Sequence, residues 1–391
     1  MLQKIWDALF APPELYRQKY AAITTKRTIR TPQLQLEPGG KAAQYANRSF
    51  ITGGALEMRL RVLKGTIAQQ LEEGRGVVVL QSAAMPVYHL TEGPQTCLAV
   101  SNGGYDPLQG RSDAEGLSLF QKVLTGLGMQ PAEVAKTTNA LSDEFHILWE
   151  NRTLNLSSFT AHSSREWSRK AFQEGNDLIA ESHSEPSVQN TLDWLRGQLC
   201  FRQISSQPGR SLWETVKPGS VTVLQFPGGK DPWILFALNE LSEFWAPTGV
   251  FAVFLDAYLH DDCRPLVEGL TCGRCFCYQD LPSQPWLWQA ATTSCIAGCV
   301  FRHMGESAQT ISRYFGQTKV QKRTQTDSRA VADCDTGGLM GLFGSTTVTE
   351  STSQSETYEW EAAVPEEAIA SLPEDEAVFI YNGTHERWRI V

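Results

Sequence analysis

Three small groups of residues have the types and spacing to do chemistry. Gly53 and Gly54 form a turn that opens an amphipathic segment, and Arg59 follows within two turns of it. Asp256 comes directly after a strongly apolar run, and Cys272, Cys275 and Cys277 have a C-x-x-C-x-C spacing. A glycine turn at a helix start suits a phosphate, an aspartate suits Mg²⁺, and paired cysteines suit zinc. The candidate chemistry is therefore anion, nucleotide or metal binding.

Alternating apolar segments predict the scaffold that must hold these groups. Val77–Leu80 and Val250–Leu255 are near-continuous apolar runs, which is typical of parallel strands covered on both faces. Helical periodicity over 55–73 separates strands at 48–52 and 76–81, and the same alternation resumes from residue 220. We therefore predict an α/β fold with a mainly parallel sheet flanked by helices.

The chain between these two α/β segments has a different pattern. Helical periods at 132–148, 163–182 and 187–200 follow one another with no strand between them. The predicted domains are accordingly an N-terminal arm (1–47), an α/β domain (48–131 and 206–391) and an all-α insertion (132–205). Within the α/β domain, 336–357 is rich in Gly, Ser and Thr and is expected to be a flexible loop, and a final hairpin is expected around Asn382-Gly383.

Composition excludes several classes of protein. The 391 residues are 41% hydrophobic and 20% charged, which is a globular composition, and the formal net charge of −9 excludes a uniformly basic nucleic-acid binder. The N-terminus has no apolar stretch typical of a signal peptide, and no segment is long and apolar enough for a transmembrane helix. We expect a cytoplasmic protein with its nine cysteines reduced, associated with a membrane only through partners.

The cysteine run and one basic segment each have a structural and a functional interpretation. Because Cys275 and Cys277 alternate with Phe276 in a predicted strand, buried thiols are favoured over zinc ligands, and no metal is expected. Residues 301–330 carry six Lys or Arg against two acids. Lys319, Lys322 and Arg323 within this segment lie either in a solvated loop or in a loop that faces nucleic acid.

Taken in order, the segments resemble the type IV coupling proteins, which are TraG/TraD-like conjugative DNA-transfer ATPases of the FtsK/HerA-like P-loop superfamily. The resemblance covers roughly 48–391 and implies a RecA/FtsK-like P-loop NTPase fold. It rests on these segments: ITGGALEMRLRVLKG, YDPLQG, KPGSVTVLQFPGGKDPW, VFAVFLDAY, CFCYQDLPSQPW, GESAQTISRYFGQTKVQ and EEAIASLPEDEAVFIYNG. By this resemblance Gly53, Gly54 and Arg59 stand at the phosphate loop (Walker A), Asp256 at the Walker B position and Gln279 at the sensor position.

The phosphate loop departs from the motif that the resemblance implies. A working loop reads G-x-x-x-x-G-K-[ST], because its glycines let N–H groups wrap phosphates and its hydroxyl holds Mg²⁺. Here Met58 replaces the second glycine, Arg59 the lysine and Leu60 the Ser or Thr. At the Walker B strand Ala257 replaces the glutamate that the family places after its aspartate; Asp261 and Asp262 are substitute candidates.

We therefore predict a degenerate, non-hydrolysing coupling-protein-like subunit of a conjugation or type IV secretion related system, binding a partner protein, DNA or both. No cofactor is expected, although ATP with Mg²⁺ stays open if the altered loop binds it. The alternative is an active ATP-driven DNA translocase with non-standard motifs, and a third interpretation is another anionic ligand at Arg59. Because the family's rings hold ATP between subunits, we expect a monomer or dimer rather than a hexamer.

Overall fold

The computed structural model describes residues 33–34, 48–173, 177–199, 209–227, 232–244, 249–294, 297–333, 346–381 and 384–390. These residues form two compact units. One unit holds the described residues from 303 to 372, and the other holds the remaining ones. The predicted arm over 1–47 lies outside the described residues except for Gln33–Leu34. The predicted domain boundaries stay a prediction.

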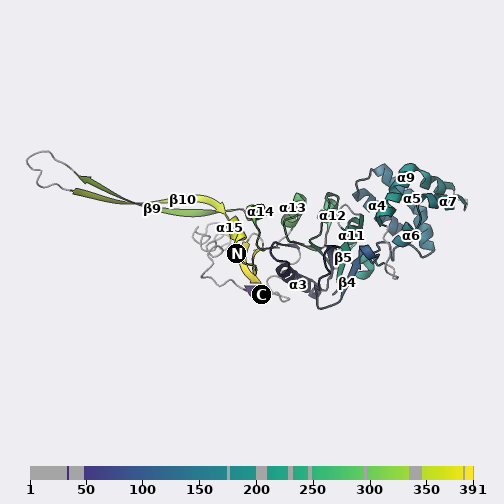
Figure 1. Ribbon diagram of the computed structural model, residues 1–391, viewed down its shortest axis with the longest axis horizontal. Coiled ribbons are helices and arrows are strands. Elements are labelled where there is room, and N and C mark those ends of the chain that lie inside the picture. Colours follow the sequence, from purple (N-terminus) through teal and green to yellow (C-terminus); the bar gives the residue numbers. More distant parts are fainter. Residues whose placement is uncertain are drawn as a thin grey trace, which may run out of the picture. The chain divides into compact units, whose positions relative to one another are not determined.

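The larger unit is built on one mixed sheet (Figure 1). Its described strands are ordered β1-β12-β11-β8-β2-β7-β6-β3-β5-β4, and every pairing from β8 to β4 is parallel, whereas β11 pairs antiparallel with β8 and β12. The predicted parallel sheet and terminal hairpin are confirmed. The strands are β1 (Gln33–Leu34), β2 (Arg48–Thr52), β3 (Gly76–Ser82), β4 (Gln95–Ala99), β5 (Val221–Phe226), β6 (Val250–Leu255), β7 (Gly273–Tyr278), β8 (Ala297–Val300), β11 (Glu376–Tyr381) and β12 (Thr384–Ile390).

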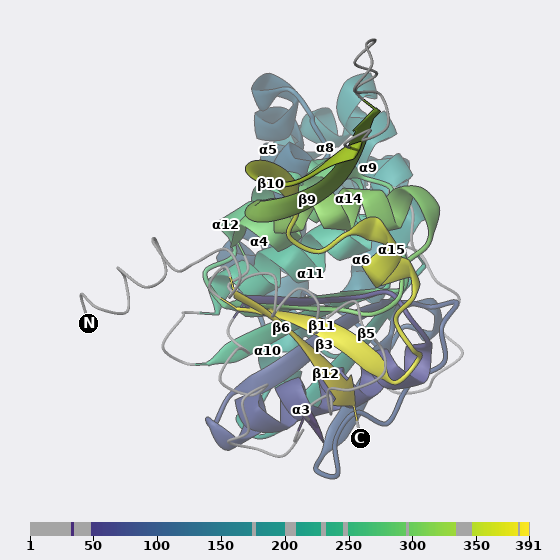
Figure 2. The same ribbon diagram turned by 90° about the vertical axis from the view of Figure 1, so that its left-hand side faces the viewer.

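Helices cover both faces of the sheet, as the apolar strands require (Figure 2). On one face, α3 (Leu56–Glu72) packs Leu63 and Ile67 against alternate side chains of the central strands, including Val77 and Val253. On the other face lies α11 (Pro232–Glu243), whose residues from Pro232 to Leu241 are all buried, the polar Asn239 and Glu240 among them. The remaining helices beside the sheet are η2 (Val100–Asn102), α10 (Leu212–Thr215), η4 (Asp261–Cys263), α12 (Arg264–Gly269) and α13 (Pro285–Ser294).

The parallel register brings three loops to the same edge of the sheet. Thr52 at the end of β2 lies opposite Tyr278 at the end of β7, and Leu255 at the end of β6 lies opposite Cys277. The residues that follow these strands are therefore neighbours, although they are far apart in the sequence. This edge holds the candidate site.

Cys275 and Cys277 of β7 belong to the sheet's core, and Cys272 lies just before this strand. Cys272, Cys275 and Cys277 are buried free thiols, and burial raises the pKa of the Cys277 thiol above its ordinary range. Among the described residues no cluster of His, Cys, Asp and Glu suits a metal ion. The buried-thiol interpretation is confirmed.

The all-helical segment is organised around a buried arginine. Arg196 donates from Nη2 to Glu144 (2.6 Å), from Nη1 to Ser164 (2.6 Å) and from Nε to the Phe159 carbonyl (3.1 Å). One side chain thus joins four helices. The helices here are α4 (Asp113–Gly126), α5 (Pro131–Glu150), α6 (Leu156–Thr160), α7 (Ser164–Gln173), α8 (Asp177–Ser184) and α9 (Pro186–Leu199).

The segment YDPLQG attaches these helices to the sheet. The Tyr105 hydroxyl donates to Glu240 on α11 (2.5 Å), and the two carboxylate oxygens of Asp106 accept from the N–H groups of Leu108 (3.0 Å) and Leu156 (2.9 Å). Burial raises the pKa of Asp106 to about 6, while these N–H donors oppose the shift. The segment that carries a family resemblance therefore has a structural role here.

The smaller unit corrects two predictions. It contains α14 (Gly305–Phe315), α15 (Glu366–Ala370) and two long antiparallel strands, β9 (Gln317–Asp333) and β10 (Thr346–Ala362). Residues 346–357 were expected in a flexible loop but belong to β10, and Lys319, Lys322 and Arg323 lie in β9 rather than in a loop. The polar residues of both strands give no hydrophobic alternation, so the sequence pattern concealed them.

The buried network predicts a pH-dependent stability. Burial raises the pKa of Glu144 from 4.5 to about 7, although Arg196 opposes this shift. A raised carboxyl pKa gives stability that is present below about pH 4.5 and lost as the pH rises through about 7. Relative to Glu144→Gln, the wild-type free energy of unfolding should fall by about 3 kcal/mol over this range, measured by urea denaturation at a series of pH values.

His183 titrates in the opposite direction and is present in both proteins, so it largely cancels in this comparison. Burial lowers the pKa of His183 to about 4, so its contribution is lost as the pH falls. Ser142→Ala, an exposed change on the same helix that removes no charge, is the control and should show no such trend. The prediction would be contradicted if the difference in the free energy of unfolding between the wild type and Glu144→Gln stayed constant with pH.

Candidate nucleotide site

The glycine turn between β2 and α3 is a tight three-residue loop. Gly53 and Gly54 have φ angles of 83° and 67°, which side-chain-bearing residues rarely adopt. The Gly53 N–H lies 3.2 Å from the Tyr278 carbonyl oxygen and 3.1 Å from that of Gln279, while the Gly54 N–H donates to Arg302 (3.2 Å). Both glycine N–H groups are therefore bound to the ends of neighbouring strands.

Gly54 also has a steric reason to be glycine. A Cβ added there would lie 2.7 Å from the Cβ of Phe301, which follows β8. Glycine at position 54 thus allows both the close approach of the loop to the end of β8 and the left-handed backbone conformation.

Helix α3 begins earlier than a phosphate-wrapping loop allows. It starts at Leu56, so Met58, Arg59 and Leu60 already lie in its first two turns. The N–H groups of Met58 and Arg59 bond to the Ala55 carbonyl at 3.1 and 3.2 Å. The side chains of Met58 and Leu60 pack against the hydrophobic core. Two motif positions that would contact phosphate and Mg²⁺ therefore serve the helix and its packing.

Arg59 and Asp256 form a salt bridge at the centre of the site. Arg59 Nη1 lies 2.9 Å from Oδ2 and 3.2 Å from Oδ1 of Asp256. The Arg59 side chain is fully buried and that of Asp256 is 22% exposed. The cation at the lysine position and the carboxylate at the Walker B position thus neutralise each other.

The backbone around Asp256 fixes this carboxylate. Asp256 has a φ of 43°, its N–H donates to the Cys277 carbonyl (2.8 Å), and its Oδ1 accepts from the Gln279 N–H (2.6 Å). The strained backbone conformation is therefore held by the end of β7. Gln279 takes part through its main chain.

The other charged groups near the two motifs have partners of their own. Glu57, in the first turn of α3, is exposed and pairs with Arg61 at 2.9 Å, one turn along the helix. Asp261, a substitute candidate for the missing glutamate, accepts from Trp286 Nε1 (2.8 Å), and Asp262 pairs with His260 (3.1 Å). Each of these carboxylates therefore has a partner within the protein.

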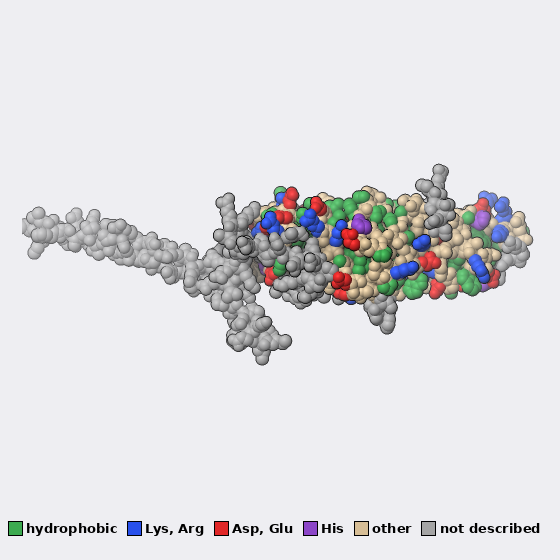
Figure 3. All heavy atoms as spheres, turned by 90° about the horizontal axis from the view of Figure 1, so that it is seen from below, with side chains coloured by type: hydrophobic (Ala, Val, Ile, Leu, Met, Phe, Trp, Pro, Cys, Tyr) green, Lys and Arg blue, Asp and Glu red, His purple; other side chains and the backbone are tan. Residues whose placement is uncertain are grey.

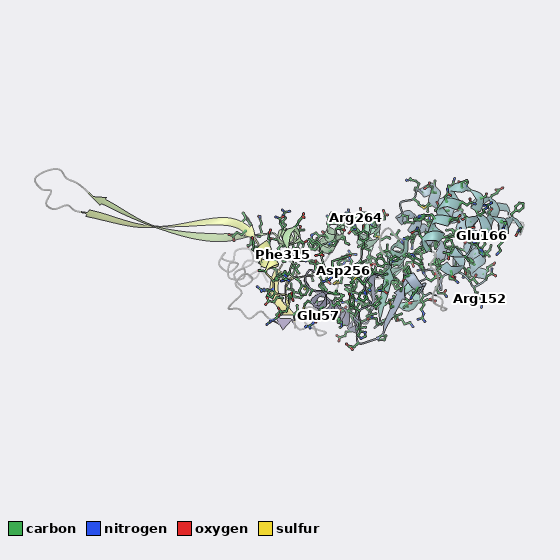
Figure 4. The ribbon with its side chains drawn as sticks, in the orientation of Figure 1. Glu57, Arg152, Glu166, Asp256, Arg264 and Phe315 are labelled. Carbon is green, nitrogen blue, oxygen red and sulfur yellow. The ribbon has the colours of Figure 1, made fainter. Side chains whose placement is uncertain are left out.

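The structure thus brings Gly53, Gly54, Arg59, Asp256 and Gln279 together at one edge of the sheet. In Figure 4 Asp256 and Glu57 lie in the part that holds the sheet, whereas Arg152 and Glu166 lie among the helices α4–α9. Lys319, Lys322 and Arg323 lie in the other unit, and their side chains are outside the described part of the chain.

Sequence reasoning missed the residues that support the site. Phe301 and the Arg302 carbonyl follow β8, and the Tyr278 hydroxyl donates to the Ala257 carbonyl (2.9 Å). The sequence could have pointed to these residues only through their position, because each lies at the end of a strand, or directly after one, that is adjacent to β2 or β6. Using this position to find them would have required the order of the strands in the sheet.

The unequal exposure of the two ions predicts unequal costs of breaking the salt bridge. Asp256→Asn leaves a buried guanidinium without its counter-ion and should cost about 3–5 kcal/mol, whereas Arg59→Met leaves a partly exposed carboxylate and should cost about 1–2 kcal/mol. The double variant should lose clearly less than the two single losses combined, as measured by urea denaturation.

The exposed Arg61–Glu57 pair is the matched control for this cycle. Arg61→Met should change stability by no more than about 0.5 kcal/mol. Additive losses at Arg59 and Asp256 would mean that the salt bridge contributes no coupling.

Comparisons with known proteins identify the fold. No family model and no curated protein matches the chain. Among solved structures, the bacterial conjugative coupling protein TrwBdeltaN70 in an unbound form matches with a TM-score of 0.51 and 11% identity, over 98% of this chain and 92% of that one. TrwB with a non-hydrolysable GTP analogue matches equally in TM-score and identity, over 97% and 92%, and TrwB with ADP and Mg²⁺ has a TM-score of 0.50 and 11% identity over 97% and 91%. The chain therefore has the P-loop NTPase fold of these structures, with a mostly parallel sheet flanked by helices.

Proposed function

We propose that this chain is a non-hydrolysing, coupling-protein-like subunit of a conjugation or type IV secretion related system. The Arg59–Asp256 salt bridge is the single observation that carries the proposal, because it joins the two charges that a working site directs at phosphate and Mg²⁺. The similarity in fold to TrwB, a conjugative coupling protein, supports the type of system.

The surroundings of the salt bridge support the loss of hydrolysis. A phosphate needs free N–H donors, and four N–H groups between Gly53 and Arg59 are bound to carbonyl oxygens. Mg²⁺ needs an oxygen where Leu60 packs into the core, and the attacking water needs a carboxylate where Ala257 stands. Restoring hydrolysis therefore requires more than moving one side chain.

A protein partner fits the charge of this chain better than DNA does. On the face seen in Figure 3, basic and acidic side chains of the described residues are intermixed, whereas nucleic-acid binders gather basic residues into a stripe. The net charge of −9 opposes general attraction to DNA. No helix of the described part of the chain has the length and hydrophobicity to cross a bilayer.

Nucleotide binding tests the proposal directly. Calorimetric titration with MgATP should give no binding heat for the wild type, for Arg59→Ala or for Arg59→Lys. The lysine variant restores the residue of the motif, but Met58 and Leu60 remain in the helix and its packing, so binding should still be absent. ATP hydrolysis should be at background with and without DNA.

The same titration distinguishes the proposed function from the alternative, an ATP-driven DNA translocase. TrwB has been solved with ADP and Mg²⁺, so a protein of this fold can bind a nucleotide. Saturable MgATP binding that is lost in Arg59→Ala, together with DNA-stimulated hydrolysis that is lost in Asp256→Asn, would replace the present proposal with the translocase.

A further inference from the structure

The β9–β10 hairpin of the smaller unit is an unusually long and regular ribbon. Seventeen consecutive pairs join the two strands, from Gln317 opposite Ala362 to Asp333 opposite Thr346. At ~3.3 Å per residue each strand is about 55 Å long. Figure 1 shows the two strands side by side along their length.

Both outer edges of this ribbon are open in the described part of the chain. β9 and β10 form a two-stranded sheet of their own, so each strand has a neighbour on one side only. Such a hairpin is marginally stable in water without a third strand or a packed face. An open edge presents unpaired N–H and C=O groups that pair readily with another strand.

Three of the usual devices that protect an edge strand, namely proline, a β-bulge and short length, are missing from these two strands, whereas a fourth device, charge, is present on both. Neither contains a proline or a glycine, and the register runs through all seventeen pairs without the offset of a β-bulge. Protected edges are also short, and these are long. The ribbon is therefore suited to receive a further strand whose charges oppose those of the edge that it joins.

The two edges differ in charge. β9 carries four Lys or Arg and two Asp, whereas β10 carries four Glu and no basic residue. Within the ribbon, Arg323 lies opposite Glu356 and Arg329 lies opposite Glu350. One edge is thus net positive and the other is net negative.

The two faces differ as well. Because successive residues of a strand alternate between faces, Thr324, Thr326 and Ser328 share one face with their cross-strand partners, which are Ser355, Ser353 and Ser351. Arg323 and Arg329 share the other face with the two glutamates opposite them. The middle of the ribbon therefore has one uncharged hydroxyl face and one charged face.

We propose that the hairpin pairs edge to edge with the hairpin of a second copy of this chain, β9 of one copy beside β10 of the next. Charge complementarity selects this occupant, since two β10 edges would set glutamates against glutamates, while β9 beside β10 sets Arg323 and Arg329 beside acids. Hairpins aligned in the same direction continue the antiparallel pattern and keep the hydroxyl faces on one side.

This contact is heterologous, because it joins two different surfaces. Heterologous contacts build closed rings or open rows rather than two-fold dimers. It involves only the smaller unit, so it is independent of the glycine loop and Asp256 and needs no nucleotide. The proposed contact would build an assembly larger than the expected monomer or dimer, through a surface other than the candidate nucleotide site.

The first experiment compares the full chain with a shortened hairpin. Removing 323–332 and 347–356 deletes ten matched pairs and leaves the register and faces of the remaining seven intact. By sedimentation velocity over a wide concentration range, the wild type should associate, and the shortened chain should associate at least tenfold more weakly while keeping the wild-type melting temperature. A wild type that stays monomeric, or a shortened chain that associates equally, would overturn the proposal.

The second experiment exchanges charges without deleting any residue. In the variant R323E/R329E/E350R/E356R the cross-strand partners keep opposite signs, so the hairpin and its self-association should both persist. Wild type mixed with this variant would set like charges beside each other at every mixed contact. Fluorescence energy transfer between labelled chains should therefore be strong within each protein and weak between the two. Equal transfer in the mixture would place the contact elsewhere and overturn the proposal.

Discussion

The salt bridge between Arg59 and Asp256 joins residues that are 197 positions apart in the sequence. A buried guanidinium costs several kcal/mol to desolvate, and the carboxylate offsets this only where its geometry is fixed. That geometry depends on β7, whose terminal carbonyl and following N–H hold Asp256, and on the early start of α3, which turns Arg59 inward. The arrangement of the whole sheet edge is therefore coupled to this one ion pair.

The scaffold was largely predictable from the sequence. Continuous apolar runs such as β3 and β6 require cover on both faces, so the alternating strands and helices and the parallel sheet followed. The family resemblance implied that Gly53, Arg59 and Asp256 belong to one site, and the structure brings them together because the parallel strands end at the same edge. The order of the strands was not readable, so the neighbours supplied by β8, such as Phe301, were missed.

Two other features were beyond sequence reasoning for a different reason. β9 and β10 contain polar residues on both faces, so no periodicity marks them as strands, and the glycine-rich composition of 336–357 suggested a loop. The sequence showed that Arg59 stands where the family motif has a phosphate-binding lysine, but it did not show which group the arginine contacts. Whether Arg59 faces an anion or an internal aspartate depends on where the helix begins.

The substitutions in the motif have a common explanation, because each new side chain makes contacts within the folded protein. The partly buried side chains of Met58 and Leu60 pack against the core, and Arg59 binds the Asp256 carboxylate. The carbonyl of the buried Ala257 accepts from the Tyr278 hydroxyl. Each residue that departs from a nucleotide motif makes a contact that stabilises the fold. Under the proposed function, a site remodelled in this way does not join subunits through bound ATP. The open edges of the β9–β10 ribbon offer a contact between copies that needs no ligand.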